Sequence, residues 1–207
     1  EFQKRILKER FKKNSIIIKN GLIIPKVTCE INNNPIILWV ASIRSIKRPN
    51  LFIELAKSIP NAHFEMVGGK VIGETLLYEK IRMAAKKVPN LRFHGFVPYY
   101  NVNEYFNRAS IFVNTSIIEG FPNTFIQAWM HNTPVVSLNV DPDKIIQNKK
   151  LGFFSGTFEQ MVLDLKILLE DETLRKAIGK NARKYVEKEH NIKKTVKKYI
   201  EVFNEIL

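Results

Sequence analysis

The chain has 207 residues, of which 45% are hydrophobic and 26% charged, and its formal net charge is +13. This composition excludes a disordered chain and fits one well-cored domain or two small ones, while the single cysteine, Cys29, excludes a disulfide framework and a cysteine-rich metal site. No apolar run approaches the ~18 residues of a bilayer span, and residues 1–13 lack the features of a secretory signal, so we expect a cytoplasmic protein.

The amino-terminal segment does not look like part of a complete domain. Residues 3–13 have helical periodicity, with Ile6, Leu7 and Phe11 on one side. Residues 15–18 are an apolar, β-branched run that predicts a strand ending at Asn20-Gly21. A lone helix and strand ahead of a full α/β pattern favour a remnant, so we assign residues 1–30 to the end of a preceding domain and a linker.

The middle of the chain alternates short apolar runs with amphipathic segments. Strands are predicted at residues 36–41, 63–67, 91–97, 110–114 and 134–138, because each run is rich in β-branched or aromatic residues and bounded by turn residues. Helical patterns lie between them, at residues 50–58, 75–88, 101–109 and 124–132. This alternation predicts an α/β fold with a parallel sheet and helices on both faces.

The carboxy-terminal part is helical and basic. Helices are predicted at residues 158–170, 172–189 and 192–207, with Gly179 as a weak point. The net charge is +6 over residues 1–26 and +5 over residues 172–207, so the positive charge lies at the two ends. Such ends usually are solvated helix faces, but they also suit an anionic membrane surface, an acidic partner or nucleic acid. Nucleic acid is not expected, because no aromatic-and-basic motif accompanies the charge.

Anion-binding features follow several of the predicted strands. Arg44, Lys47 and Arg48 follow the first strand, and Gly68-Gly69-Lys70 follows the second. After the fourth strand, residues 119–123 open directly into a helix. Free backbone N–H groups at a helix start attract phosphate, and carboxyl ends of parallel strands are where α/β proteins bind ligands. Gly120 would permit close backbone approach, and Asn123 or Thr124 would cap the helix.

Metal ions are not predicted by any residue pattern. Asp141-Pro142-Asp143 could hold a divalent cation, but it fits better a turn in which Asp143 caps a short helix. The four histidines are too scattered for a ligand cluster. Lys70 lacks the glycine spacing of a nucleotide P-loop.

Several of these segments together resemble family-four glycosyltransferases of the GT-B fold. Residues 119–130 (EGFPNTFIQAWM), followed by 134–136, are similar to the signature region of that family. Residues 39–42 and 47–49 resemble its first-strand loop, and residues 93–97 resemble the strand that meets the nucleotide base. The resemblance spans about residues 36–155. It implies a Rossmann-like carboxy-terminal half, with a nucleotide-sugar-binding domain at 31–190, the end of the acceptor half at 1–30 and a final helix, 191–207, that crosses back to that half.

The resemblance also implies roles for single residues, with two departures from the family pattern. Glu119 would be the catalytic residue, in contact with the donor sugar, and Gln127 would stand where the family has a ribose-binding glutamate. Ser42 stands where many relatives have the diphosphate-binding arginine; Lys47 is retained, and either Arg44 or Arg48 could substitute. The expected donor site is completed by Gly68, Phe96, Val97, Gly120, Phe121, Asn123 and Thr124. The Phe96 side chain is expected to be packed rather than stacked on a base, Val97 to act through its backbone, and Trp129 to lie in the core.

The function implied by the resemblance is the donor-binding half of a retaining, metal-independent glycosyltransferase without a cofactor. It would move a sugar, a hexosyl group, from a nucleoside-diphosphate sugar to a glycan or lipid-linked acceptor in polysaccharide biosynthesis, and the half alone would transfer little. Two alternatives stay open: a non-catalytic nucleotide-binding or interaction module of the same fold, favoured by Gln127 and Ser42, and a basic nucleic-acid-binding domain. Peripheral contact of the basic end helices with the inner face of the membrane is a further hypothesis.

Overall fold

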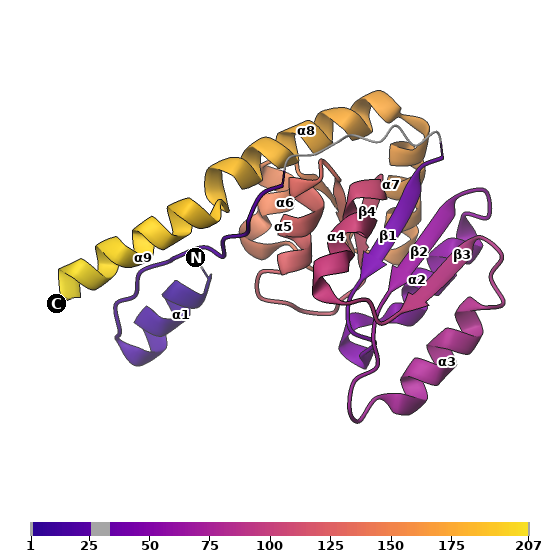
Figure 1. Ribbon diagram of the computed structural model, residues 1–207, viewed down its shortest axis with the longest axis horizontal. Helices are drawn as coiled ribbons and strands as arrows, with labels where there is room; N and C mark the ends of the chain where they lie inside the picture. The colour runs from indigo at the N-terminus through magenta and orange to yellow at the C-terminus, as the bar shows by residue number, and fades with distance from the viewer. Residues whose placement is uncertain (1, 26–33, 207) are drawn as a thin grey trace.

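The computed structural model of the chain describes residues 2–25 and 34–206 (Figure 1). Cys29 and the domain boundary expected at residue 30 lie outside these residues. The described residues form a six-stranded parallel sheet in the order β3-β2-β1-β4-β5-β6. Its strands are β1 (Ile36–Val40), β2 (His63–Val67), β3 (Leu91–Gly95), β4 (Ile111–Asn114), β5 (Val135–Ser137) and β6 (Gly152–Phe154). The order reverses between β1 and β4, which is the switch point where such sheets bind ligands.

Helices cover both faces of this sheet, as predicted (Figure 1). One hydrophobic cluster packs α2 (Pro49–Ser58), α3 (Thr75–Ala85) and α7 (Phe158–Glu170) against the sheet. The other packs α4 (Tyr99–Arg108), α5 (Asn123–Met130), α6 (Ile145–Asn148) and α8 (Glu172–Glu189) against the opposite face. The described helices also include α1 (Phe2–Phe11), α9 (Ile192–Ile206) and two short 3-10 turns, Ser45–Lys47 and Pro142–Lys144.

The central strand β1 is apolar on both sides of the sheet. In β1, Ile37 and Trp39 face one cluster while Leu38 faces the other, and all three are buried. Burying side chains of this size contributes roughly 1.5–3 kcal/mol each. The continuous apolar runs in the sequence therefore correspond to central parallel strands covered on two faces.

Two strand assignments need correction. Residues 15–18 are not a strand, because no strand edge lies beside them in the described structure; the nearest pairing is a single bridge between Leu22 and Asn191. Conversely, β6 was not predicted from the sequence. Gly152 opens it, and a Cβ there would collide with the Val135 carbonyl group, so glycine allows β6 to approach β5.

The segment around residues 19–25 docks on the junction of α8 and α9. Leu22 donates its backbone N–H to the His190 carbonyl at 2.9 Å, and Ile192 donates to the Leu22 carbonyl at 3.1 Å. The His190 ring is buried, with Nδ1 2.7 Å from the Asn20 carbonyl. Gly179, the suspected weak point, lies inside α8, where a Cβ would collide with the Asn132 carbonyl group, so glycine permits close packing there.

Candidate functional site

The carboxyl edge of β1 and β4 brings together two of the four charged side chains that the sequence singled out, Lys47 and Glu119. Lys47 ends the 3-10 turn after β1, and Glu119 lies in the loop between β4 and α5. The Lys47 Nζ atom is 2.7 Å from Glu119 Oε2, and both side chains are largely shielded from solvent. Residues 72 positions apart in sequence therefore meet at the switch point, on the loop that leads into α5.

Glu119 is held as a carboxylate by its neighbours. Its Oε1 atom accepts hydrogen bonds from Asn114 Nδ2 at 2.8 Å and from Ser116 Oγ at 2.7 Å. Burial is the largest single influence on its pKa and raises it, but the hydrogen bonds from Lys47, Ser116 and Asn114 together outweigh burial, so the pKa of Glu119 is lowered. The site thus contains a partly buried, ionised carboxylate with a lysine across it.

The three cations of the first loop have different environments. Lys47 pairs with Glu119, whereas Arg48 is turned inward, and its Nε donates to the Thr115 carbonyl at 2.9 Å. The side chain of Arg44 is exposed, and so is Ser42. The structure therefore leaves Arg44 as the cation of this loop with the freest access to an incoming anion.

The start of α5 is not capped as the sequence suggested. The helix begins at Asn123, the preceding Pro122 is its N-cap, and no side-chain hydrogen bond caps it. Asn123 instead accepts a hydrogen bond from Asn20 Nδ2 at 2.9 Å, so neither Asn123 nor Thr124 is the cap. The first N–H groups of a helix have no acceptor within the helix, and the dipole adds positive potential there.

Of the two residues before Pro122, Phe121 is packed against other rings and Gly120 is exposed. The Phe121 ring packs against His190, with centroids 5.0 Å apart, and against Trp129, which is fully buried as predicted. Gly120 is exposed in the bend before Phe121. Backbone atoms at Gly120, rather than the Phe121 side chain, are therefore accessible in this loop.

At the carboxyl ends of β2 and β3, the expectation for Phe96 is wrong. Phe96 was expected to be packed, but its side chain is 74% exposed, with its ring over Gly69. Gly68 is buried, its N–H donates to the Gly95 carbonyl at 2.9 Å, and a Cβ there would collide with the Ala41 carbonyl group. Val97 packs on the core beneath. An exposed aromatic ring thus lies at the edge where the base was expected.

Gln127 lies inside α5 and is only 4% exposed. Gln127 therefore does not lie on a solvent-exposed face of this helix. Its Nε2 atom is 3.4 Å from Asn103 Oδ1 on α4. The amide is anchored between two helices on the same side of the sheet.

The Asp141-Pro142-Asp143 motif caps a helix, but through the other aspartate. Asp141 Oδ1 accepts from the Ile146 N–H at 2.7 Å, and Oδ2 accepts from Gln147 Nε2 at 3.0 Å. Asp143 has a left-handed backbone, with φ of 52°, and precedes the helix without capping it. Among the described residues, no group of three or more His, Cys, Asp or Glu could hold a metal ion.

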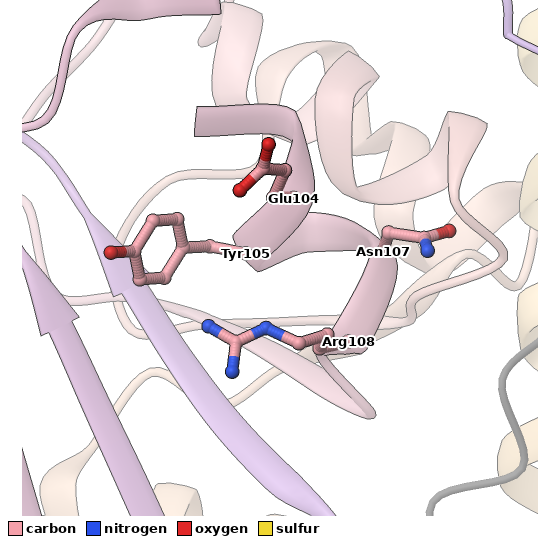
Figure 2. Close-up of a pocket in the computed structure, with 4 residues that line it drawn as sticks. All are labelled: Glu104, Tyr105, Asn107 and Arg108. Atoms are coloured by element: carbon pink, nitrogen blue, oxygen red, sulfur yellow. The ribbon is translucent and has the colours of Figure 1, made fainter. Parts of the chain in front are cut away.

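Two hollows lie away from this edge. One of about 310 Å³ lies on α4, lined by Glu104, Tyr105, Asn107 and Arg108 (Figure 2). The Arg108 side chain there lies over the Tyr105 ring and contacts Glu65 on β2, with Nη2 3.2 Å from Oε2. The other, of about 490 Å³, lies near the start of β1 and β2, against α7. Residues of the carboxyl edge line neither hollow.

Sequence reasoning missed the polar residues that hold the site together. Asn114, Thr115 and Ser116 form a polar run at the end of the apolar strand β4, and all three are buried. That run was visible in the sequence, directly ahead of Glu119. Buried polar side chains at the carboxyl end of a central strand must find hydrogen-bond partners, which was the available signal.

Comparison with known proteins gives a family match over most of the chain. The family model described as glycosyl transferases group 1 matches residues 23–185. A Haemophilus influenzae protein described as an uncharacterized glycosyltransferase is 28% identical over 210 residues, covering 96% of this chain and 58% of that protein. The capsular polysaccharide biosynthesis glycosyltransferase CapM of Staphylococcus aureus is 29% identical over 164 residues, covering 76% of this chain and 42% of CapM. The chain thus spans about half the length of the curated relatives it matches.

A similar structure is that of S. aureus TarM, crystallised with fondaparinux, α-GlcNAc-glycerol and UDP. The TM-score is 0.84 at 20% sequence identity, and the match covers 99% of this chain and 42% of TarM. At this identity the likeness concerns the fold, and it includes the terminal helices as well as the sheet.

Proposed function

The chain belongs to the family of glycosyl transferases group 1, and on that basis we propose that it is the half of a glycosyltransferase that binds the nucleoside-diphosphate sugar donor. Its fold is the Rossmann-like fold of the carboxy-terminal half of GT-B glycosyltransferases. The observation that carries the proposal is the 2.7 Å pair of Lys47 and Glu119 at the β1–β4 switch point, on the loop that enters α5.

In this proposal the diphosphate is neutralised by Lys47, by the exposed Arg44 and by the N–H groups at the start of α5. An ammonium and oriented N–H groups are suited to phosphate oxygens. Glu119 would accept hydrogen bonds from hydroxyls of the donor sugar. Arg48 is a poorer phosphate ligand, because its guanidinium is already committed to the Thr115 carbonyl.

The nucleoside would lie along the edge beyond β3 and α5. Phe96 is exposed and able to contact a base. In this proposal Val97 offers its backbone and Gln127 contacts the ribose. Gly68, Gly120, Phe121, Asn123 and Thr124 complete the proposed site, mainly through backbone shape.

The reaction we propose is retaining sugar transfer to a glycan or lipid-linked acceptor without a metal ion. The acceptor hydroxyl oxygen bonds to the anomeric carbon, and the bond between that carbon and the diphosphate oxygen breaks. The diphosphate leaves with the electron pair of that bond, so negative charge develops on it, and it takes up the proton of the acceptor hydroxyl. Cations and N–H groups already in place stabilise that charge without reorganisation. A role in polysaccharide biosynthesis is supported by the name of the relative CapM.

We propose that residues 191–207 cross back to a second half that supplies the acceptor site. This proposal is supported by α9, which exposes an apolar stripe of Val196, Tyr199, Ile200 and Phe203. A stripe of this kind on an otherwise basic helix is suited to pack against another part of a longer protein. The chain alone is then expected to bind donor but to transfer little sugar.

The test is calorimetric titration of the chain with a panel of nucleoside diphosphates, including UDP. We predict binding of at least one of them, unchanged by EDTA, and a roughly tenfold weaker affinity in Lys47→Met, about 1.4 kcal/mol. The matched control is Lys57→Met, since Lys57 also pairs with a carboxylate, Glu54, but on the exposed face of α2.

Binding of no nucleoside diphosphate would contradict the proposal and favour a non-catalytic interaction module. Equal losses in Lys47→Met and Lys57→Met would remove Lys47 from the site.

A further inference from the structure

The side-chain hydroxyl of Thr115 forms hydrogen bonds with β1 and with the loop that follows β1. Thr115 directly follows β4, and its side chain is fully buried. The Oγ1 atom accepts from Trp39 Nε1 at 2.9 Å and donates to the Lys47 carbonyl at 2.7 Å, with the Arg48 carbonyl at 3.1 Å. Burial of an unpaired hydroxyl is unfavourable, so these bonds fix where the hydroxyl must lie.

Two further hydrogen bonds join the loop after β1 to the segment after β4. Arg48 Nε donates to the Thr115 carbonyl at 2.9 Å, and the Ile117 N–H donates to the Ile46 carbonyl at 2.9 Å. Arg48 has a left-handed backbone with φ of 47°. A non-glycine residue adopts this conformation at a cost, so the surrounding hydrogen bonds must hold the turn in place.

These backbone contacts act on the two charged groups of the proposed donor site. Asn114 and Ser116, on either side of Thr115, both donate to Glu119 Oε1. Thr115 itself holds the main chain of Lys47, whose ammonium reaches Glu119 Oε2. One three-residue segment after β4 therefore orients the carboxylate and anchors the backbone of the lysine.

We propose that Thr115 is a positioning residue whose hydroxyl sets the distance and direction of Lys47 relative to Glu119. Without that hydroxyl the Lys47–Arg48 turn keeps its bonds from Arg48 Nε and from the Ile117 N–H but loses the one that holds the Lys47 carbonyl itself, so the position of the ammonium becomes less well defined. The consequence for diphosphate binding rests on the proposed function, but the geometry of the pair does not.

The test compares Thr115→Val, which keeps the shape and removes the hydroxyl, with Thr115→Ser, which restores the hydroxyl. The matched control is Thr133→Val. Thr133 is 1% exposed and lies just before β5, away from the carboxyl edge. Its hydroxyl donates to the Ala109 carbonyl at 3.2 Å. The side-chain carboxyl of Glu119 is titrated by NMR in the ¹³C-labelled chain and assigned with Glu119→Gln, and UDP affinity is measured alongside.

We expect Thr115→Val to raise the pKa of Glu119, because burial then acts with less compensation from Lys47, and to weaken UDP binding about tenfold. Thr115→Ser should restore both values, and Thr133→Val should change neither. If Thr115→Val does not fold, Thr115→Cys, with a weakly donating thiol of similar size, provides the same comparison.

An unchanged Glu119 pKa in the folded Thr115 variant would overturn the inference, as would an equal rise in Thr133→Val. A shifted Glu119 pKa in a chain that binds no nucleoside diphosphate at all would instead contradict the proposed function and leave the positioning role standing.

Discussion

At the scale of single residues, the three cations of the loop after β1 differ in exposure and in their partners, although they are close together in the sequence. Arg44, Lys47 and Arg48 lie within five positions of one another, yet one is exposed, one is paired with Glu119 and one donates into the protein. The difference arises from the backbone, which is extended at Arg44, forms a 3-10 turn that ends at Lys47 and is left-handed at Arg48. The availability of a cation for an anion therefore depends on backbone path as much as on residue type.

Gln127 allows a test of the ribose contact at the scale of one residue. We predict that Gln127→Glu strengthens UDP binding by on the order of 1 kcal/mol, because a carboxylate accepts from both ribose hydroxyls more strongly than an amide oxygen. Calorimetry with UDP and with its 2′,3′-dideoxy analogue separates the contact from a general effect of charge. A gain of equal size with both nucleotides, or no gain with UDP, would argue against it, and Gln127→Met serves as the uncharged control.

At the scale of elements, the ends of helices are where the structure most often departs from expectation. Two predicted caps, at Asn123 or Thr124 and at Asp143, are absent, and Asp141 caps α6 from farther upstream. By contrast, Thr157 and Asp171 cap α7 and α8 through their side chains, accepting from the N–H groups of Gln160 and Leu174. Whether a polar residue caps a helix depends on its backbone conformation as well as on its identity.

The end of α5 carries a prediction about pH. His131 follows this helix, and its buried ring nitrogens have no hydrogen-bond partner within the described part of the chain. Burial, reinforced by the charge of Arg183, lowers the pKa of His131 to about 4. The unfolded chain takes up this proton near pH 6.5 and the folded chain does not, so stability is full above about pH 6.5 and falls as the pH drops toward 4.

We therefore predict that His131→Phe flattens the loss of stability between pH 6.5 and 4. The difference reaches at most about 1.4 kcal/mol per pH unit in that window. Urea unfolding at pH 7, 6 and 5 measures it, and a phenyl ring keeps the stacking with Phe106. His63→Gln, at an exposed position, is the control. A variant that loses stability as steeply as the wild type in this window would refute the prediction.

At the scale of the whole molecule, the helices α1 and α9 extend away from the sheet (Figure 1). Both expose apolar side chains, including Phe11 on α1 and Phe203 on α9. Lysines are frequent in and beside both helices, in keeping with the charge at the two ends of the sequence. Within the described residues, no helix combines the length and the apolar character that a membrane span requires. The exposed apolar side chains of the two helices support the proposal of a contact with a second half, and the lysines beside them support the hypothesis of a contact with a membrane surface.

The membrane hypothesis is tested by neutralising Lys8, Lys12 and Lys13 together. Each lysine near an anionic surface contributes about 1 kcal/mol, so we predict that cosedimentation with anionic vesicles falls at least tenfold. The control neutralises Lys57, Lys86 and Lys87, which are exposed on the sheet domain. Unchanged vesicle binding after loss of the first three lysines would end the hypothesis.

The order of strands and helices was readable from the sequence because hydrophobic periodicity is a local property. Five of the six strands and the long helices follow it, and the motif around Glu119 indicated the family. The two wrong strand assignments are at segments where the local sequence pattern and the long-range strand pairing disagree. Residues 15–18 have strand character but no neighbouring strand edge among residues 2–25 and 34–206, while β6 has weak strand character and a neighbour in β5.

The sequence by itself determined that this protein has an α/β fold and that cations follow its first strand. Only the tertiary structure decided which charges meet, because Lys47 and Glu119 come together through strand order and not through spacing along the chain. The same holds for Thr115, whose hydroxyl finds Trp39 and Lys47 only once β1 and β4 lie side by side. Periodicity sets which residues are buried, but partners of buried polar groups depend on which elements the fold makes neighbours.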